Sequence, residues 1–128
     1  MSDPVPPAAP APDPAPAPPA PEIGIDEFFK VKLVTAQIVE AVPHPKADRL
    51  MILQLQVGER RKQIVSGIRQ HYTPEQLVGK TIILVDNLKP AKLRGETSEG
   101  MLLAVGQPDG GLRLLTTDGP SPAGLSIS

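Results

Sequence analysis

The sequence contains no cysteine. Disulfide bonds, thiolate zinc sites and a cysteine nucleophile are therefore excluded. No apolar run approaches the roughly 18 residues that a membrane-spanning helix needs. The N-terminus has neither the basic nor the apolar region of a secretory signal. These absences predict a cytoplasmic protein with no membrane partner.

Aromatic side chains are scarce. Phe28, Phe29 and Tyr72 are the whole set, and both phenylalanines precede the region richest in strand-forming residues. Proteins that bind single-stranded nucleic acid without sequence preference stack bases on aromatic side chains, with a gain of about 1–3 kcal/mol per base. Because that platform is absent, any nucleic-acid recognition here should rest on phosphates, ribose hydroxyls and shape.

The formal net charge is only −1, but the charges are unevenly distributed. Residues 30–100 hold twelve Lys and Arg against seven Asp and Glu, an excess of five positive charges. A local excess of this kind can bind phosphate even when the whole-chain charge conceals it.

Residues 1–21 consist mainly of proline and alanine, with ten prolines. Proline removes backbone donors, and so little large apolar surface cannot offset the entropy of ordering. We predict a disordered, semi-extended leader ahead of one domain at residues 22–128. A ligand for an SH3-type domain is disfavoured because no Lys or Arg flanks the prolines.

The domain begins with acidic residues followed by aromatic ones at 25–29, which predicts a short helical turn docked on the body. Residues 31–42 and 50–57 alternate apolar with polar side chains, the period of a strand. Residues 58–60 predict a hairpin turn into a third strand at 61–65.

A short helix is predicted after the third strand. Thr73 is a suitable N-cap, Pro74 fits the first turn where no N–H is needed, and Gln76 stands three residues after the cap. Gly79 is expected to end this helix.

Two apolar runs follow, at residues 81–85 and 101–105, and they predict strands buried on both sides. A long polar, basic loop at 86–100 separates them, and a further strand is predicted at 112–116. Three strands, a helix and two strands match an all-β, five-stranded OB-fold barrel with a short helix between strands three and four, here followed by a C-terminal extension.

OB-fold barrels bind ligands on the face of strands two and three, beside the loops that join strands one to two and four to five. In this sequence those loops are residues 43–49 and 87–100, and both are basic. Arg60, Arg61 and Lys62 stand at the hairpin between the two face strands. We therefore expect these cations to rim one RNA-binding surface.

Four segments carry a family resemblance: IDEF at 25–28, HPKADRL at 44–50, QIVSGI at 63–68 and NLKPAKLRGETSEGM at 87–101. From about residue 22 to the C-terminus, the chain resembles the tRNA-binding domain at the C-terminus of many bacterial methionyl-tRNA synthetases. The same domain occurs in separate synthetase β-chains, in free-standing tRNA-binding proteins and in the endothelial monocyte-activating polypeptide. The resemblance implies an OB-fold barrel that binds tRNA outside the anticodon and forms a homodimer.

By position, the resemblance implies RNA contacts at Asn87, Lys89, Lys92, Arg94, Ser98 and Met101. The first basic loop and the hairpin add His44, Lys46, Arg49, Arg61 and Lys62. Lys and Arg neutralise phosphate, whereas Asn and Ser hydrogen-bond ribose or backbone oxygens. Met101 can lie against a base or pack in the barrel. The family's Asp-Leu-Arg-Val is replaced here by residues 32–35 (KLVT), so contacts through that arginine are lost.

No catalytic, metal or cofactor site is predicted. Residues 79–81 (GKT) lack the earlier glycine and the strand-to-helix order of a phosphate-binding loop. His44 and His71 have no companion ligands, and neither Ser66 nor Ser98 has a His–Asp partner pattern.

We predict a non-catalytic tRNA-binding protein, acting alone or in trans as a β-chain with a methionyl-tRNA synthetase catalytic chain. The alternative is an OB-fold export chaperone for unfolded preproteins, a branch that lacks the ending seen at 98–101. The expected homodimer would bury the C-terminal extension together with Ile23, Ile25, Phe28 and Phe29.

Overall fold

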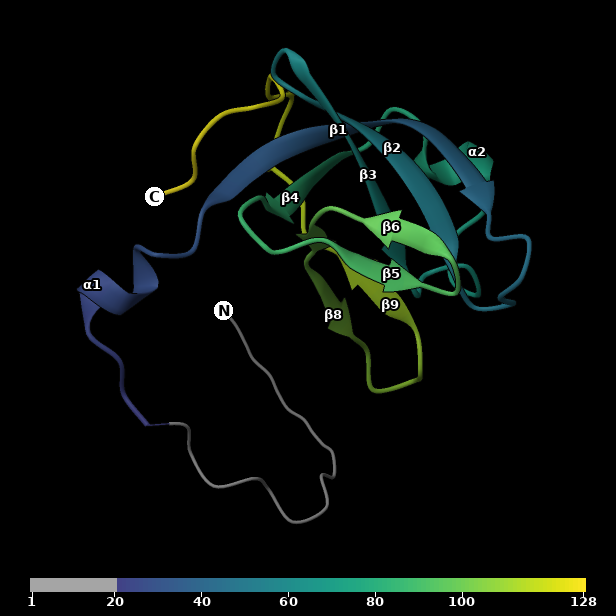
Figure 1. Cartoon of the computed structure of the whole chain (residues 1–128), viewed down its shortest axis with the longest axis horizontal. Helices are drawn as coiled ribbons and strands as arrows, with labels where there is room; N and C mark the ends of the chain where they lie inside the picture. The colour runs from purple at the N-terminus through teal and green to yellow at the C-terminus, as the bar shows by residue number, and fades with distance from the viewer. Residues whose placement is uncertain (1–20) are drawn as a thin grey trace.

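The computed structural model describes residues 21–128. The predicted disordered leader falls on residues 1–20 and Pro21, so nearly all of it lies outside the described residues. The described chain forms a curled antiparallel sheet in the order β3-β2-β1-β4-β7 (Figure 1). Its strands are β1 (Leu33–Pro43), β2 (Met51–Val57), β3 (Arg60–Ser66), β4 (Thr81–Val85) and β7 (Met101–Leu102). Outside this sheet are two short helices, α1 (Ile25–Phe28) and α2 (Pro74–Leu77), and two hairpins, β5 (Ala91–Leu93) with β6 (Glu96–Ser98) and β8 (Ala104–Gly106) with β9 (Leu112–Leu114).

The order of the sheet strands and α2 confirms the predicted OB-type barrel. Alternation along β2 buries Leu53, Leu55 and Val57 in the core. On β1 the pairing register shifts between Ile38 and Glu40, the mark of a bulge. The extra residue lets Ile38 and Ala41, three positions apart, both be buried, and it bends the strand around the core.

Helix α2 also follows the prediction. The Thr73 hydroxyl accepts a hydrogen bond from the Gln76 amide, and the Gln76 side chain accepts one from the Thr73 amide, which completes a capping box. Gly79 lies just after the helix and donates its N–H to the Ile38 carbonyl at 2.7 Å. The helix is thereby fixed to the middle of β1.

The barrel closes between β3 and the segment before β7 through side chains as well as backbone. The Ser98 hydroxyl accepts from the Val65 amide at 3.0 Å and donates to the Gly100 carbonyl at 3.0 Å. The Glu99 carboxylate accepts from the Gln63 amide at 2.9 Å, and the Glu99 amide donates to the Gln63 carbonyl at 2.8 Å. Ser98 and Glu99 therefore provide hydrogen-bond partners for the backbone groups at the edge of β3.

Gly100 lets the same segment lie against β4. A Cβ atom at this position would stand 2.8 Å from the Val85 carbonyl oxygen, a backbone atom that cannot easily move. We expect Gly100→Ala to lower the free energy of unfolding by about 1–3 kcal/mol through overpacking. Urea unfolding measures the change. Gly119→Ala is the control, because its Cβ would meet nothing within 4 Å; equal midpoints for the two variants would refute the explanation.

The predicted strand at 101–105 is wrong in extent. β7 ends at Leu102, and the Leu103 amide still donates to the Ile83 carbonyl of β4 at 3.3 Å. Residues 104–106 form β8, which pairs with β9 instead, and Val105 is 50% exposed. An unbroken apolar run therefore does not continue as one buried strand, because only its first part pairs with β4. The predicted loop at 86–100 likewise contains the β5–β6 hairpin.

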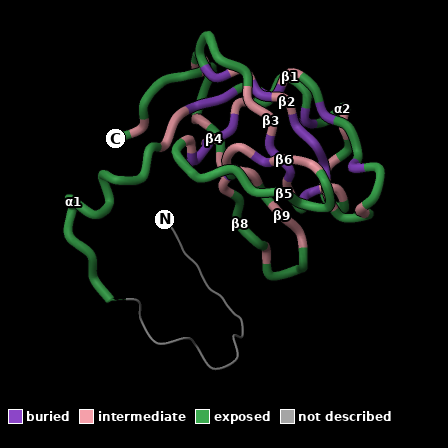
Figure 2. Tube along the Cα trace, in the orientation of Figure 1, coloured by how far each residue is buried: buried purple, intermediate pink, exposed green. Residues whose placement is uncertain are grey.

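The predicted helical turn near the N-terminus is present as α1, but it does not dock on the body. None of its residues is buried, and Phe28 and Phe29 remain 42% and 56% exposed. Figure 2 shows this segment as exposed and extending away from the sheet. The prediction of docking was wrong for the single chain.

The C-terminal extension pairs with the first half of β1, beyond the end of the β1–β2 ladder. The Thr35 hydroxyl donates to the Pro122 carbonyl at 2.8 Å and accepts from the Leu125 amide at 3.0 Å. The Ile127 amide donates to the Leu33 carbonyl at 2.9 Å. The extension thus covers part of the β1 edge.

Candidate nucleic-acid interface

A tight turn at Arg94 and Gly95 forms the tip of the β5–β6 hairpin. Leu93 pairs with Glu96, and the two residues between them have φ values of 55° and 92°. Two consecutive positive φ values are typical of a type I′ turn, which favours Asn-Gly. Among non-glycine residues of the described chain, only Arg94 has a positive φ. The arginine is therefore held in a strained conformation, which is common at functional positions.

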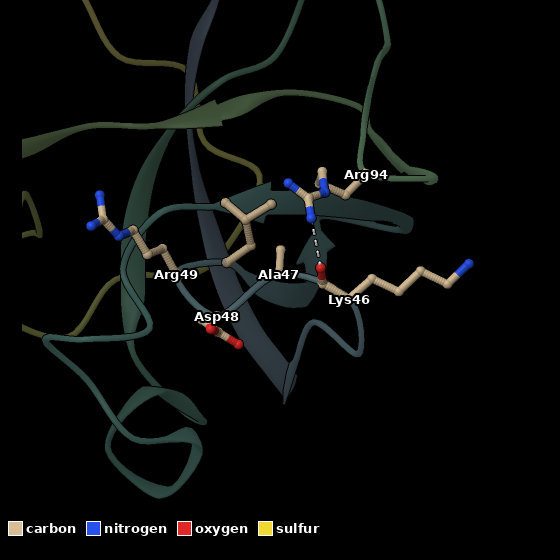
Figure 3. A pocket seen from close by; sticks show the side chains of 6 residues that line it. Lys46, Ala47, Asp48, Arg49 and Arg94 are labelled. Carbon is tan, nitrogen blue, oxygen red and sulfur yellow. Dashed lines mark hydrogen bonds between the residues drawn. The ribbon is translucent and has the colours of Figure 1, made fainter.

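Arg94 connects this hairpin tip to the loop between β1 and β2. Its Nη2 donates to the Lys46 carbonyl at 3.1 Å (Figure 3). Together the two segments border an open, shallow pocket of about 360 Å³ lined by Lys46, Ala47, Asp48, Arg49, Leu50 and Arg94. We call it the basic pocket.

The basic pocket holds three cations and one carboxylate, Asp48. Figure 3 shows the Lys46 and Arg49 side chains extending to opposite sides while Arg94 bends toward the Lys46 backbone. Among residues 21–128 none of the three cations forms an ion pair. An anionic group such as a phosphate would therefore find available donors there.

Arg94 has two roles, one as a turn residue with a positive φ and one as a cation available to RNA, and Arg94→Asn tests them separately. Asparagine tolerates a positive φ, so the turn should lose strain of about 1 kcal/mol, offset by loss of the bond to the Lys46 carbonyl. We expect urea unfolding to show unchanged or slightly higher stability, while phosphate-dependent RNA binding weakens. Arg94→Lys, which keeps the charge, is the matched control. A variant that is destabilised yet binds RNA normally would contradict this account.

His44 differs from its predicted role as an RNA contact. Its side chain is 2% exposed, and Nδ1 accepts from the Lys46 amide at 3.0 Å. Because the backbone amide can only donate, the proton of a neutral ring is on Nε2, which donates to the Leu93 carbonyl at 3.1 Å. With both nitrogens engaged, His44 joins the two loops from inside rather than touching a ligand.

Arg69 holds the backbone of the loop between β1 and β2, a role that was not predicted from the sequence. Its Nη1 donates to the carbonyls of His44 at 3.3 Å and Ala47 at 3.2 Å, and its amide donates to the Arg49 carbonyl. The sequence carries no signal for this role, because a lone arginine after a strand is indistinguishable from a solvated surface residue. Arg69 thereby fixes the backbone that presents Lys46 and Arg49.

A second, mainly apolar pocket of about 350 Å³ lies at the base of the hairpin. Leu88, Leu93 and Met101 contribute exposed apolar side chains to it, and Lys89 stands among its lining residues. We call it the apolar pocket. Ser98, a predicted contact, also lines it, but its hydroxyl is buried and engaged in closing the barrel.

Two further predicted contacts are engaged within the chain. The Asn87 side chain accepts from the Lys32 amide at 2.9 Å and donates to the Lys30 carbonyl at 2.6 Å, which holds the segment before β1. The Lys62 side chain is 18% exposed, and its ammonium contacts the Asp86 carboxylate at 2.7 Å and the carbonyls of Asp86 and Glu99. The structure therefore gives both residues a role in positioning the second loop.

Asp86 anchors this arrangement just before the second loop. Its carboxylate contacts both Lys62 and Arg60 at 2.7 Å, and its side chain is 15% exposed. Burial alone raises the pKa of the Asp86 carboxyl, but the hydrogen bonds and charges of Lys62 and Arg60 outweigh burial and hold the pKa below its ordinary value.

We expect Asp86→Asn to reduce the free energy of unfolding by about 1–3 kcal/mol at neutral pH, because Lys62 loses its counter-charge. A lowered carboxyl pKa stabilises the fold above the unfolded-state value, near about pH 4, and this contribution disappears as the pH falls through the folded-state pKa. The difference between wild type and variant should therefore shrink at acid pH. Urea unfolding at several pH values measures this difference in free energy of unfolding, with Asp118→Asn as the control. A difference that stays constant with pH would contradict the role given to the Asp86 carboxylate.

The remaining cations are exposed but lie apart from the basic pocket. Lys92 lies on β5 opposite Thr97. Arg61 pairs with Gln56 near the β2–β3 turn, at the opposite end of that ladder from the first loop. The structure thus brings Lys46, Arg49 and Arg94 together and Lys89 beside Met101, but it does not place Arg61 with them.

No helix among residues 21–128 is long and apolar enough to cross a membrane. Within the same residues, no three His, Cys, Asp or Glu side chains gather as a potential metal site.

Curated relatives are methionine–tRNA ligases. The chain is 54% identical to that of Bacillus subtilis over 107 residues, which cover 84% of this chain and 16% of the ligase. It is 50% identical to that of Thermotoga maritima over 106 residues, covering 83% of this chain and 17% of the ligase. The chain therefore spans about a sixth of the length of these relatives.

Solved structures confirm the fold. A MetRS-related protein from Pyrococcus horikoshii has a TM-score of 0.79 at 31% identity, covering 85% of this chain and 100% of the other. The chaperone CsaA from Bacillus anthracis has a TM-score of 0.77 at 27% identity, covering 84% and 100%. The sequence profile described as "Putative tRNA binding domain" matches residues 33–126. The chain belongs to this putative tRNA-binding domain family.

Proposed function

We propose that residues 22–128 bind tRNA without catalysing a reaction. The observation that carries this proposal is the basic pocket, which Lys46, Arg49 and Arg94 line from two separate loops, each without an ion-pair partner in the described chain. Membership in the putative tRNA-binding domain family supports tRNA as the ligand.

The mechanism is electrostatic capture followed by docking on shape. The exposed cations of the two loops draw the phosphate backbone to this side of the barrel, and the fixed loops then fit the shape of the folded RNA. These cations are Lys46, Arg49, Lys89, Lys92 and Arg94, whereas Arg61 lies at the other end of the β2–β3 ladder. His44, Arg69 and Asn87 do not touch the tRNA; they hold the backbone from which the cations project.

Titration of bulk bacterial tRNA at several salt concentrations tests the function. If five cations each neutralise one phosphate, log K should fall with log[salt] with a slope of about −3.5 to −4.5. A DNA duplex with the same number of phosphates is the control, and it should bind more weakly because it lacks ribose hydroxyls and the folded RNA shape. Binding that is absent, or that does not depend on salt, would overturn the proposal.

We also propose that the chain acts in trans, in the cytoplasm, with the catalytic chain of a methionyl-tRNA synthetase. The similarity to a sixth of each methionine–tRNA ligase supports this partner. Adding the chain to a methionine–tRNA ligase whose homologous C-terminal segment has been deleted should lower KM for tRNA and leave kcat unchanged. An unchanged KM would indicate a stand-alone role.

A homodimer would cover the apolar N-terminal segment. Ile23, Ile25, Phe28 and Phe29 are all exposed in one chain, and clustered exposed apolar side chains are typical of an interface. Light scattering at micromolar concentration should give the mass of two chains. Phe28→Ser with Phe29→Ser should give one, whereas Val78→Ser, an exposed apolar residue after α2, should leave the dimer intact. A monomeric wild type would refute the dimer.

A further inference from the structure

The apolar pocket has a chemistry that phosphate binding does not explain. Leu88, Leu93 and Met101 are 45%, 37% and 50% exposed, and all three line it. No acidic residue of the described chain lines it, and Lys89 is its one charged lining residue. Its volume of about 350 Å³ is within the range of small-ligand pockets. Such a pocket suits an uncharged, apolar group that is attached to an anionic group.

The two pockets are adjacent along the hairpin. Leu93 lines the apolar pocket, and the next residue, Arg94, lines the basic pocket. Lys92 precedes both residues and is exposed. One polymer with alternating anionic and flat apolar groups could therefore occupy both pockets at once. A nucleotide chain has this alternation, whereas a peptide does not carry a charge at every unit.

The rim also offers polar groups. Ser66 and Gly67 lie at the end of β3 and line the apolar pocket. The Ser66 side chain forms no hydrogen bond within residues 21–128, so its hydroxyl can donate to or accept from the edge of a ligand. A purine or pyrimidine has polar edges and apolar faces, which matches this lining.

We propose that the apolar pocket takes one unstacked nucleobase of the bound tRNA, with Leu88, Leu93 and Met101 against its faces and Lys89 near its phosphate. This inference rests on the proposed tRNA-binding function and adds a contact to a single base. It assigns to aliphatic side chains the role that aromatic platforms have in other single-strand binders.

Two kinds of variant test the pocket. Leu88→Ser with Met101→Ser removes two of its three large exposed apolar side chains, and Gly67→Leu fills it from a position whose Cβ would meet nothing within 4 Å. The matched control is Val78→Ser with Val105→Ser, two exposed apolar residues outside both pockets. Both kinds of pocket variant should bind bulk tRNA about tenfold more weakly with an unchanged salt slope, because the lost contact is not ionic.

Chemical probing of the base edges of one tRNA transcript gives a second readout. Wild-type protein should change the chemical reactivity of one unpaired base. A pocket variant at saturating concentration should protect the same phosphates, but the reactivity of that base should remain as in free tRNA. Salt-dependent tRNA binding that is identical in wild type and pocket variants would overturn the pocket proposal and leave the function intact. Absent tRNA binding would overturn both. Pocket variants that lose binding of an unfolded apolar peptide but keep tRNA binding would assign the pocket to peptides instead.

Discussion

Replacing Lys46, Arg49 and Arg94 together with glutamine should weaken tRNA binding by about a hundredfold at moderate salt, since each charge-assisted contact is worth about 1 kcal/mol or more at an exposed site. The slope of log K against log[salt] should become less steep by about 2 to 3 units, because each lost phosphate contact removes about 0.7 to 0.9 of a unit. Binding isotherms at four or five salt concentrations give both quantities.

The matched control removes three positive charges at positions outside the basic pocket. Lys32, Lys80 and Arg113 are exposed and lie outside both pockets. Their joint replacement with glutamine should reduce the affinity much less and leave the slope nearly unchanged. If the two triple variants behaved alike, net charge alone would explain binding and the basic pocket would have no special role.

His44→Ala should have the largest effect of a single substitution on stability. The change leaves a cavity and deprives the Lys46 amide and the Leu93 carbonyl of their partners, so the free energy of unfolding should fall by about 3 kcal/mol. At temperatures where the variant remains folded, tRNA binding should also weaken, because the two loops are no longer joined.

Hydrogen exchange separates these two effects. The Lys46 amide should lose protection in His44→Ala even when the core amides of β2 remain protected. His71→Ala is the control: His71 is exposed and its side chain forms no hydrogen bond within residues 21–128, so the change should stay within about 0.5 kcal/mol of wild type. Unaltered Lys46 protection in His44→Ala would contradict the proposed connection.

The strands were predictable from the sequence where one periodicity extended over a whole element. The alternation at Leu53, Leu55 and Val57 gave β2 its correct inner face, and the capping residues around Pro74 located α2. The prediction failed at residues 101–105, because an apolar run does not reveal where the chain leaves a sheet. It also failed for α1, whose apolar side chains remain uncovered in one chain.

The candidate site was predictable in its location but less so in its roles. Basic residues in the two loops do lie at neighbouring positions, as Lys46 and Arg94 show. Ser98 was predicted for its hydroxyl, Lys62 for its charge and His44 for its place in a basic loop, but burial and internal partners decide which of these side chains remain free. Burial depends on tertiary packing, which a residue type alone does not indicate.

The segment Ser98–Gly100 changes how the family motif is interpreted. Ser98 and Glu99 satisfy the edge of β3, and Gly100 permits close packing on β4. Their presence therefore indicates how the barrel closes, and only Met101, exposed beside the apolar pocket, remains available for a ligand.

Ultraviolet cross-linking of the wild-type chain to tRNA, followed by peptide mapping, tests most directly whether the two loops form one binding surface. We expect cross-linked nucleotides on peptides from residues 43–50 and from residues 87–101 in the same complex. Cross-links confined to α2 or to the β8–β9 hairpin would show that the tRNA lies elsewhere and would contradict the account.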